Sequence, residues 1–294
     1  MMYALLTRLL TIEIPFDPNV FSIGGLDISW HGVFTAIGVI AGVSIAAYFG
    51  LKAGISEDHT YNIALAVVVG GIIGARTLYV MENWSRFDNN LGDVFALNAG
   101  GISIYGALIG GSLFAWIYCL LAKVPNIPVA ADVGAMGGIV GMAIGRIGDI
   151  INGEHYAQAT SLPWAVRYTD AQSPGFYGNP LGQGVATHPV VAYELLADLA
   201  IFAVLYLIYK RVNRPGVTFF SWAILYSAVR LPLSFLRLDN TVLWGLRMAQ
   251  VVAIIVLAIS IPVLYYLLFG VPKARGPSRA QRRRLQRSAR RRAG

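Results

Sequence analysis

Apolar stretches long enough to cross a lipid bilayer recur along this chain, and they constrain its fold more than any other feature. Hydrophobic residues make up 56% of the sequence and charged residues only 13%. A membrane-spanning helix needs about 20 mostly apolar residues. Stretches of this kind lie at 29–50, 61–80, 102–122, 128–149, 189–209, 217–235 and 244–270. The sequence therefore predicts an all-α polytopic membrane protein with seven transmembrane helices.

The basic residues predict how these helices are oriented. An odd number of spans places the two ends of the chain on opposite sides of the membrane. The tail 271–294 carries Lys273 and nine arginines with no acidic residue, so it is expected to be cytoplasmic. Lys123 and Lys210 then fall on the cytoplasmic side as well, and the acidic loops and the N-terminus fall outside. Such a tail could bind nucleic acid, but directly after a membrane helix it more simply contacts anionic headgroups, and we expect no nucleic-acid partner.

The domain organisation follows from the same pattern. Residues 1–270 are expected to form one seven-helix transmembrane domain with an interfacial segment, 1–28, and two external loops, 81–101 and 150–188. The segment 1–14 has short apolar runs and no small-residue cleavage site, which favours an interfacial helix over a signal peptide. The single cysteine, Cys119, lies inside the third span and is interpreted as a packing residue.

Small residues at three- and four-residue spacing predict close helix packing. They occur in the second, third and fourth spans as Gly70, Gly71, Gly74, Gly106, Gly110, Gly134, Gly137, Gly138, Gly141 and Gly145. We expect these three helices to form a rigid centre that holds Arg76, Tyr105 and Arg146. The external loop 150–188 is rich in glycine, proline and aromatic residues, a composition that suits an ordered flap over a site.

Charged residues gather at the outer ends of these helices. The densest run, at 145–155, reads GRIGDIINGEH, and arginines occupy comparable positions on three spans: Arg76, Arg146, Arg230 and Arg237. A guanidinium at this depth costs a few kcal/mol unless it reaches the interface, pairs with an acid or meets an anion. Each arginine could simply reach the interface. Together they predict a site for a phosphate group, most simply that of a phospholipid, because guanidinium forks match phosphate oxygens.

The other polar residues leave several interpretations open. Arg146 and Asp149 are three residues apart on one helical face and could only neutralise each other. Glu154 is free to hold an arginine, a hydroxyl group or a proton. His31 and His155 could act as bases near neutral pH or could be hydrogen-bonded packing residues. Glu194 is expected to orient a helix contact. The glycine and acidic patterns offer no convincing nucleotide or metal site, so no cofactor is expected.

Four sequence runs resemble the prolipoprotein diacylglyceryl transferase family. They are GRIGDIINGEH, SIYGALIGG in the third span, HPVVAYE at the fifth and VRLPLSFLR in the sixth, and the resemblance covers residues 28–237. It implies an enzyme of the bacterial plasma membrane that moves the diacylglyceryl group of phosphatidylglycerol onto the lipobox cysteine of a prolipoprotein, releasing glycerol phosphate. Carried over by position, it implies that the site contains Arg76, Arg146, Asn152, Gly153, Glu154 and Arg230.

The chain also departs from the pattern of this family. It has His31 where a tyrosine is common and Tyr105 where many members have a histidine. Asp149 replaces an asparagine, Ala157 a glycine and Ser234 a glutamate. Tyr105 would be a poor base at its reference pKa of about 10. A mechanism that depends on a histidine at that position therefore does not transfer to this chain.

The residues together predict a displacement reaction. Arg146 and Arg230 would bind the lipid phosphate, and Glu154 and Asn152 would orient the glycerol headgroup. Asp149, Gly153, Arg76 and Arg237 complete the predicted substrate site. The base that removes the thiol proton could be Tyr105, His31, His155 or water. Two alternatives stay open: a phospholipid-binding homologue without transferase activity, and an anion transporter that uses the arginines as a path.

Overall fold

The structure is a computed structural model that describes residues 11–24, 26–88, 90–96 and 101–270. The described residues form seven long helices. The helices are α2 (Trp30–Lys52), α3 (Glu57–Glu82), α4 (Ile104–Leu121), α5 (Ile127–Asn152), α7 (Val190–Arg211), α8 (Val217–Leu236) and α9 (Met248–Tyr265), with a π-helical turn at Tyr266–Gly270. All seven are long and apolar enough to cross a membrane. The predicted fold class is thus confirmed, and most predicted boundaries lie within a few residues of the observed ones.

The helix ends follow local sequence signals. Ser29 caps α2 by accepting a hydrogen bond from the backbone N–H of Gly32. Asn126 caps α5 in the same way, and Pro128 occupies the first turn, where a missing N–H costs nothing. At its other end α5 stops at Gly153, whose φ of 78° places it in the left-handed region that favours glycine. This stop fixes where the charged run leaves the helix.

Close glycine contacts join the helices in two separate pairs. Gly38 and Gly42 of α2 lie against the backbone of Gly141 and Gly137 of α5, and in α3 and α4 Gly74 faces Gly106 in the same way. The expectation of one packed centre made of the second, third and fourth helices is therefore wrong: α3 packs on α4, and α5 packs on α2. A Cβ built on Gly134, Gly138 or Gly145 meets nothing within 4 Å, so these glycines make no such contact.

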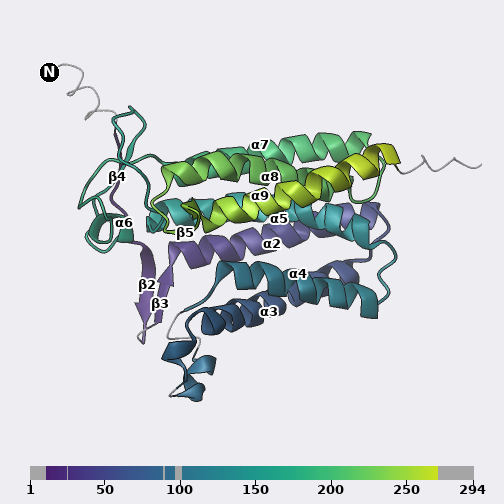
Figure 1. Ribbon diagram of the computed structural model, residues 1–294, viewed down its shortest axis with the longest axis horizontal. Helices are drawn as coiled ribbons and strands as arrows, with labels where there is room; N and C mark the ends of the chain where they lie inside the picture. Colours follow the sequence, from purple (N-terminus) through teal and green to yellow (C-terminus); the bar gives the residue numbers. More distant parts are fainter. Residues whose placement is uncertain (1–10, 25, 89, 97–100, 271–294) are drawn as a thin grey trace, which may run out of the picture.

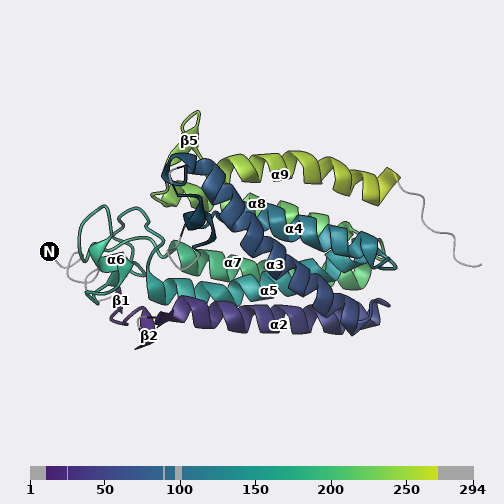
Figure 2. The ribbon, with the colours of Figure 1, turned by 90° about the horizontal axis from the view of Figure 1, so that it is seen from below.

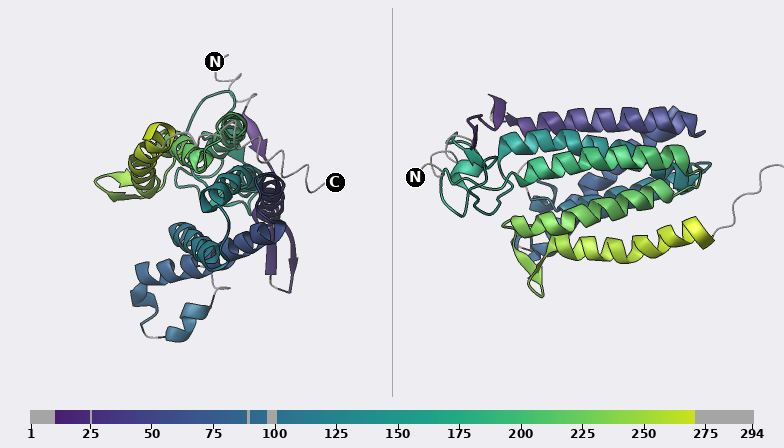
Figure 3. Two further views of the ribbon diagram at one scale, coloured as in Figure 1. Left: turned by 90° about the vertical axis from the view of Figure 1, so that its right-hand side faces the viewer. Right: turned by 90° about the horizontal axis from the view of Figure 1, so that it is seen from above.

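The remaining helices pack on the other side of α5. Seen end-on in Figure 3, α2 and α5 lie in the middle, with α3 and α4 on one side and α7, α8 and α9 on the other. Ile139 of α5 is buried with Ile201 and Leu205 of α7. Asp132 of α5 caps α8 by accepting 2.7 Å hydrogen bonds from the backbone N–H groups of Gly216 and Phe219. The position of α8 relative to α5 is thereby fixed.

Short strands and turns gather at one end of the bundle (Figures 1 and 2). They are β1 (Ile12–Ile14), β2 (Asn19–Ile23), β3 (Leu26–Ser29), η1 (Trp84–Arg86), η2 (Leu91–Phe95), β4 (Val166–Tyr168), α6 (Pro174–Tyr177), β5 (Thr241–Leu243) and β6 (Leu246–Arg247). β2 and β3 form one antiparallel hairpin, and β5 and β6 form another. The helices α2 and α7 begin at this end, and α5 and α8 finish there.

β1 corrects one expectation about the N-terminal segment. It pairs in parallel with β4, with Ile12 opposite Val166 and Ile14 opposite Tyr168. An interfacial helix that continues to residue 14 is therefore wrong, because the backbone at 12–14 is extended and hydrogen-bonded to a distant loop. Residues 1–10 of that predicted helix, and the basic tail 271–294, lie outside the described residues.

Candidate functional site

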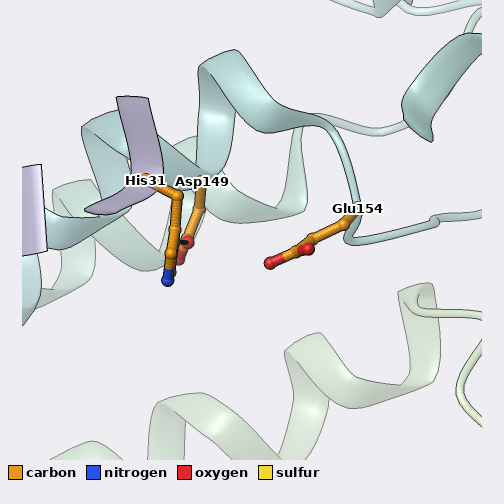
Figure 4. Close-up of side chains that lie close together, drawn as sticks. All are labelled: His31, Asp149 and Glu154. Atoms are coloured by element: carbon orange, nitrogen blue, oxygen red, sulfur yellow. Dashed lines mark hydrogen bonds and ion pairs between the residues drawn. The ribbon is translucent and has the colours of Figure 1, made fainter. Parts of the chain in front are cut away.

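A histidine and an aspartate meet where α2 begins and α5 ends. His31 Nδ1 lies 2.6 Å from Asp149 Oδ1, and the Asp149 carboxylate is 7% exposed whereas the histidine side chain is 44% exposed. Gly148 permits this approach, since a Cβ there would lie 2.7 Å from the Cα of His31. Figure 4 shows the ring against the carboxylate, with Glu154 pointing toward both from the chain that follows α5. Two residues 118 positions apart are thus held in contact by helix packing.

Asp149 has further partners on its other oxygen. Arg146, one turn earlier on α5, donates a hydrogen bond of 2.9 Å to Asp149 Oδ2. His155 Nε2 lies 3.4 Å from the same oxygen. Charge-assisted contacts of this kind keep a buried carboxylate ionised. The pairing of Arg146 with Asp149 considered from their spacing is therefore present, but it is one part of a larger network.

Glu194 on α7 is the centre of that network. Its carboxylate is 4% exposed and contacts three arginines: Arg146, Arg230 and Arg237. The nearest oxygen–nitrogen distances are 3.0 Å to Arg146 Nη2 and 3.8 Å to Arg237 Nη1, and Arg230 Nη1 is hydrogen-bonded to Glu194 Oε1. The expectation that Glu194 orients a helix contact agrees with this geometry, although the sequence did not reveal that all three arginines converge on it.

Arg237 connects this centre to the segment after α8. Its Nε donates a 2.8 Å hydrogen bond to Asp239, and its Nη2 lies 3.1 Å from His155 Nδ1. His155 therefore bridges Arg237 and Asp149. Asp239 was not predicted from the sequence, and the signal that could have revealed it is its position two residues after Arg237.

Of the three arginines, Arg230 contacts the fewest acidic and histidine side chains among the described residues: one, against two for Arg146 and three for Arg237. Within the described part of the chain, its side chain makes one hydrogen bond, to Glu194, and the side chain is 19% exposed. A guanidinium has five N–H donors. Tyr105, at the start of α4, lies within electrostatic range of Arg230, Arg237 and Asp239. Tyr105 therefore belongs to the Arg230 side of the site, whereas His31 belongs to the Asp149 side.

The loop after α5 is tied to the end of that helix. Tyr168 donates a 2.9 Å hydrogen bond to the carbonyl of Ile150, and Ser173 donates one of 3.2 Å to the carbonyl of Asn152. Burial raises the pKa of Tyr168, so its hydroxyl stays protonated and able to donate. Both side chains pack against Gly153, where a Cβ would lie 2.6 Å from Tyr168 Cε1. The loop thereby fixes Asn152, which is buried, and Glu154, which is exposed.

Arg76 occupies a different place from the other arginines. It is buried on α3 and donates hydrogen bonds of 2.8 Å to the backbone carbonyls of Val94 and Gly101 and one of 2.5 Å to that of Asp93. These contacts hold the segment that follows α3. The geometry favours a structural role for Arg76, so we leave it out of the phosphate site proposed below.

The acidic and histidine groups also show what the site could do with a cation. Ligand atoms of His31, Asp149 and Glu154 lie within 4.8 Å of one another. Asp149, however, already contacts Arg146 and both neighbouring histidines. A cation bound there would face a guanidinium at hydrogen-bonding distance from its main ligand. The arrangement suits proton transfer and anion binding better than metal binding.

Comparison with known proteins shows which family the chain belongs to. A sequence model described as prolipoprotein diacylglyceryl transferase matches residues 18–266. The chain belongs to the prolipoprotein diacylglyceryl transferase family. A phosphatidylglycerol–prolipoprotein diacylglyceryl transferase of Clostridioides difficile is 37% identical over 239 residues, which cover 81% of this chain and 90% of that protein. The enzymes of the same name from Dehalococcoides mccartyi (strain ATCC BAA-2266) and Acaryochloris marina are 35% and 33% identical, over 86% and 85% of this chain and 95% and 90% of theirs.

Family membership and the seven apolar helices agree on where the protein is located. The named relatives are bacterial, and the seven apolar helices make this member of the family a multi-pass protein of the plasma membrane. Two of the positions at which it departs from the family pattern, His31 and Asp149, contact each other. Two others, Ala157 and Ser234, are buried: Ala157 pairs with Arg237 in a β-bridge, and Ser234 donates a hydrogen bond to the carbonyl of Leu231.

Proposed function

We propose that this protein transfers the diacylglyceryl group of phosphatidylglycerol to the thiol of the lipobox cysteine of a prolipoprotein. The observation that supports it most strongly is the convergence of Arg146, Arg230 and Arg237 on Glu194 at one end of a membrane bundle. Arginines held at that depth suit a lipid phosphate. The relatives carry a name that states this reaction. The prolipoprotein and the lipid are the expected substrates, with the membrane as their common location.

The reaction requires charge stabilisation more than it requires a strong nucleophile. The cysteine sulfur attacks the glycerol carbon that carries the phosphate, a carbon–sulfur bond forms, and the carbon–oxygen bond breaks. The bonding electrons leave with the oxygen, so the phosphodiester monoanion becomes a glycerol phosphate dianion. Arginine forks that bind the phosphate more strongly in this second state lower the barrier. A free cysteine with a pKa of about 8.5 is already a few per cent thiolate at neutral pH.

Arg146 and Arg230 are the proposed phosphate ligands. Three arginines meet three carboxylates in the network, those of Asp149, Glu194 and Asp239, so the cluster is formally neutral before substrate binds. Arg230 has N–H groups without a hydrogen-bond partner among the described residues, and its side chain is the most exposed of the three arginines. A phosphate that binds at Arg230 adds an anion to a cluster already held rigid by Glu194, which limits the cost of reorganisation.

The residues after α5 supply the proposed headgroup contacts. Glu154 is exposed next to His31 and Asp149, and Asn152 is the last residue of α5. A carboxylate and an amide are suitable partners for the hydroxyl groups of a glycerol headgroup. Gly153 and Asp149 act in this proposal by placing these two side chains, and Arg237 acts by holding His155 and Glu194.

Orientation is part of the same proposal. With the basic tail in the cytoplasm, α9 finishes on the cytoplasmic side, and the opposite end of the bundle, where α5 and α8 finish, faces outward (Figure 1). A cysteine at the end of a secretion signal leaves the membrane on that side. This placement brings both substrates to one end of the bundle, the lipid from the outer leaflet and the peptide from the translocated chain.

The test is transfer in cells depleted of their own transferase. This chain is expressed there with a lipobox-bearing precursor, and mass spectrometry measures whether the precursor gains the diacylglyceryl thioether. Arg146→Ala and Arg230→Ala are each expected to reduce the transfer rate by about 100-fold or more. The double variant should reduce it by much less than the two single effects multiplied together, since both arginines act on one phosphate. Arg86→Ala is the control, because Arg86 is an exposed arginine whose guanidinium contacts Tyr79.

Two further measurements separate loss of chemistry from loss of fold. Arg230→Lys keeps the charge but lacks the planar fork, so it should fold normally and transfer slowly. Thermal unfolding in detergent is measured for every variant. Near-normal rates in both alanine variants would refute the phosphate site. A well-folded wild-type chain that gives no mass gain but co-purifies with phosphatidylglycerol would instead identify a lipid-binding homologue.

A further inference from the structure

The His31 ring has one nitrogen that the network leaves unused. Nδ1 lies 2.6 Å from the buried Asp149 carboxylate, and the described residues provide no hydrogen-bond partner for Nε2. A carboxylate accepts only, so the neutral ring must carry its proton on Nδ1 and present a lone pair on Nε2. The side chain is 44% exposed, so this nitrogen is accessible. The arrangement is that of a base held in one tautomer by a buried acid.

His155 cannot play this part without breaking the network. Its Nε2 lies 3.4 Å from Asp149 Oδ2, and its Nδ1 lies 3.1 Å from Arg237 Nη2. An arginine can only donate, so Nδ1 accepts, and the proton of the neutral ring is then on Nε2, directed at Asp149. Both nitrogens are therefore engaged. Taking up a proton would place it on Nδ1, facing a guanidinium.

Tyr105 is the other candidate, and its surroundings suit it less. It lies on the Arg230 side, within electrostatic range of Arg230, Arg237 and Asp239, and no carboxylate in the described residues accepts a hydrogen bond from its hydroxyl. A neutral phenol must first lose its own proton before it can accept one, which is unfavourable at neutral pH. Tyr105 is better suited to donate a hydrogen bond to a phosphate oxygen held by Arg230.

From this geometry we infer that His31 is the base of the reaction and that Asp149 is its positioning residue. This inference rests on the proposed function, which leaves open the residue that removes the thiol proton. The sulfur–hydrogen bond of the cysteine breaks, the proton moves to His31 Nε2, and the sulfur keeps the electron pair that attacks the glycerol carbon. Asp149 holds Nδ1–H and stabilises the imidazolium ion. The proton then passes to the glycerol phosphate dianion or to water, which restores the neutral ring.

Among the described residues, the charged groups that act most strongly on the ring are on or next to α5. Asp149 and Glu154 favour the protonated ring, and Arg146 opposes it. Arg146 also donates to Asp149, which leaves Asp149 Oδ1 for His31 alone. Gly148 keeps the backbone of α5 against the first turn of α2, so the distance between ring and carboxylate is set by backbone contact. The base is therefore positioned before substrate arrives.

The experiment uses the full chain in detergent with phosphatidylglycerol and a synthetic lipobox peptide. The peptide carries either cysteine or selenocysteine at the acceptor position, and a selenol is already ionised at neutral pH. For His31→Gln we expect kcat/KM with the cysteine peptide to fall about 100-fold or more at pH 7. The deficit should shrink toward pH 9, where the thiol, with a pKa of about 8.5, ionises unaided. With the selenocysteine peptide His31→Gln should be close to wild type.

Asp149→Asn and His59→Gln complete the design. Asp149→Asn should lose activity with the cysteine peptide and recover only in part with the selenol, since Asp149 holds Arg146 as well as the ring. His59→Gln should match wild type, because His59, in the first turn of α3, contacts Tyr118, in the last turn of α4, and both of these helix ends lie at the opposite end of the bundle (Figure 1). An equal loss with both peptides, or no loss in His31→Gln, would overturn the inference. A wild-type chain that transfers neither peptide would instead refute the proposed function.

Discussion

Single residues in this site are held by partners far away in the chain. Glu194 is the clearest case, because its one buried carboxylate contacts arginines from α5, α8 and the segment after α8. Removing one member of such a network leaves a charge buried without its partner, which typically costs about 3–5 kcal/mol. The network therefore stabilises the fold of this end of the molecule and also determines where the arginines present their remaining donors.

Gly153 gives a prediction at this scale. Its φ of 78° disfavours any other residue, and a Cβ there would lie 2.6 Å from Tyr168 Cε1 and 2.9 Å from Ser173 Oγ. Gly153→Ala should thus add about 1–2 kcal/mol of backbone strain to about 1–3 kcal/mol of overpacking. We expect the thermal unfolding midpoint in detergent to fall, and the transfer rate with it, because Glu154 and Asn152 shift.

Gly184 provides the matched control for that substitution. It lies in the same loop between α5 and α7 with a φ of 66°, but a Cβ there meets nothing within 4 Å. Gly184→Ala therefore pays the backbone strain without the clash. The expected order of unfolding midpoints is wild type, then Gly184→Ala, then Gly153→Ala. Equal midpoints for the two variants would show that the contact with Tyr168 contributes nothing.

The sequence reveals the identity of charged residues more readily than their partners. The run at 145–155 and the arginines of α8 stand out because charge at the end of an apolar helix is costly. Arg76 satisfies the same criterion, yet its donors go to backbone carbonyls of the segment after α3. Only the path of that segment distinguishes Arg76 from Arg146. The contact between His31 and Asp149 was likewise unpredictable, because it depends on which helix α5 packs against.

Helix pairs are the next scale, and glycine determines how closely they approach. Gly137 of α5 faces Gly42 of α2, and a Cβ on Gly137 would lie 3.0 Å from the carbonyl carbon of Gly42 and 3.1 Å from Ala46 Cβ. Gly138, its neighbour in sequence, has open space within 4 Å. Gly137→Ala should therefore separate α2 from α5 and lower the unfolding midpoint, whereas Gly138→Ala should leave it unchanged or raise it slightly.

This pair of variants also connects packing to chemistry. His31 is on α2 and Asp149 is on α5, so a small separation of the helices lengthens their hydrogen bond. Transfer measured at pH 7 should fall in Gly137→Ala and recover with a selenocysteine acceptor, as in the His31 variant. If Gly138→Ala is as damaging as Gly137→Ala, the close contact between α2 and α5 is not what positions the site.

Helix boundaries and the spacing of small residues within each helix were predictable from the sequence, but which helices pack against each other was not. A period of three or four residues identifies the face of a helix that packs closely, and it says nothing about which helix packs there. This explains why the glycines of α3, α4 and α5 suggested one centre while the structure has two pairs. β1 was missed for a related reason, because three residues carry little periodic signal and their extended form depends on pairing with β4.

At the scale of the whole molecule, the site must face the compartment in which its substrates meet. The strands share one end of the bundle with the ends of α5 and α8, and α7 and α9 finish at the other end (Figure 1). Arg146 and Arg230 of the charged network are on α5 and α8. The distribution of Lys and Arg predicts that this second end is cytoplasmic. The reverse orientation would place the arginine cluster in the cytoplasm, on the wrong side for a cysteine exposed by secretion.

Cysteine labelling in intact cells tests this orientation directly. Gln172 is exposed in the loop between β4 and α6, and Asn213 is exposed between α7 and α8, whereas the native Cys119 is buried and should not react. A maleimide that cannot cross the membrane is expected to label Gln172→Cys in spheroplasts and to label Asn213→Cys only after permeabilisation. The opposite pattern would invert the topology and, with it, the access of a secreted precursor to Arg146 and His31. The labelling result therefore bears on the proposed chemistry as well as on the fold, since a thiol can reach His31 only from the side on which α2 begins.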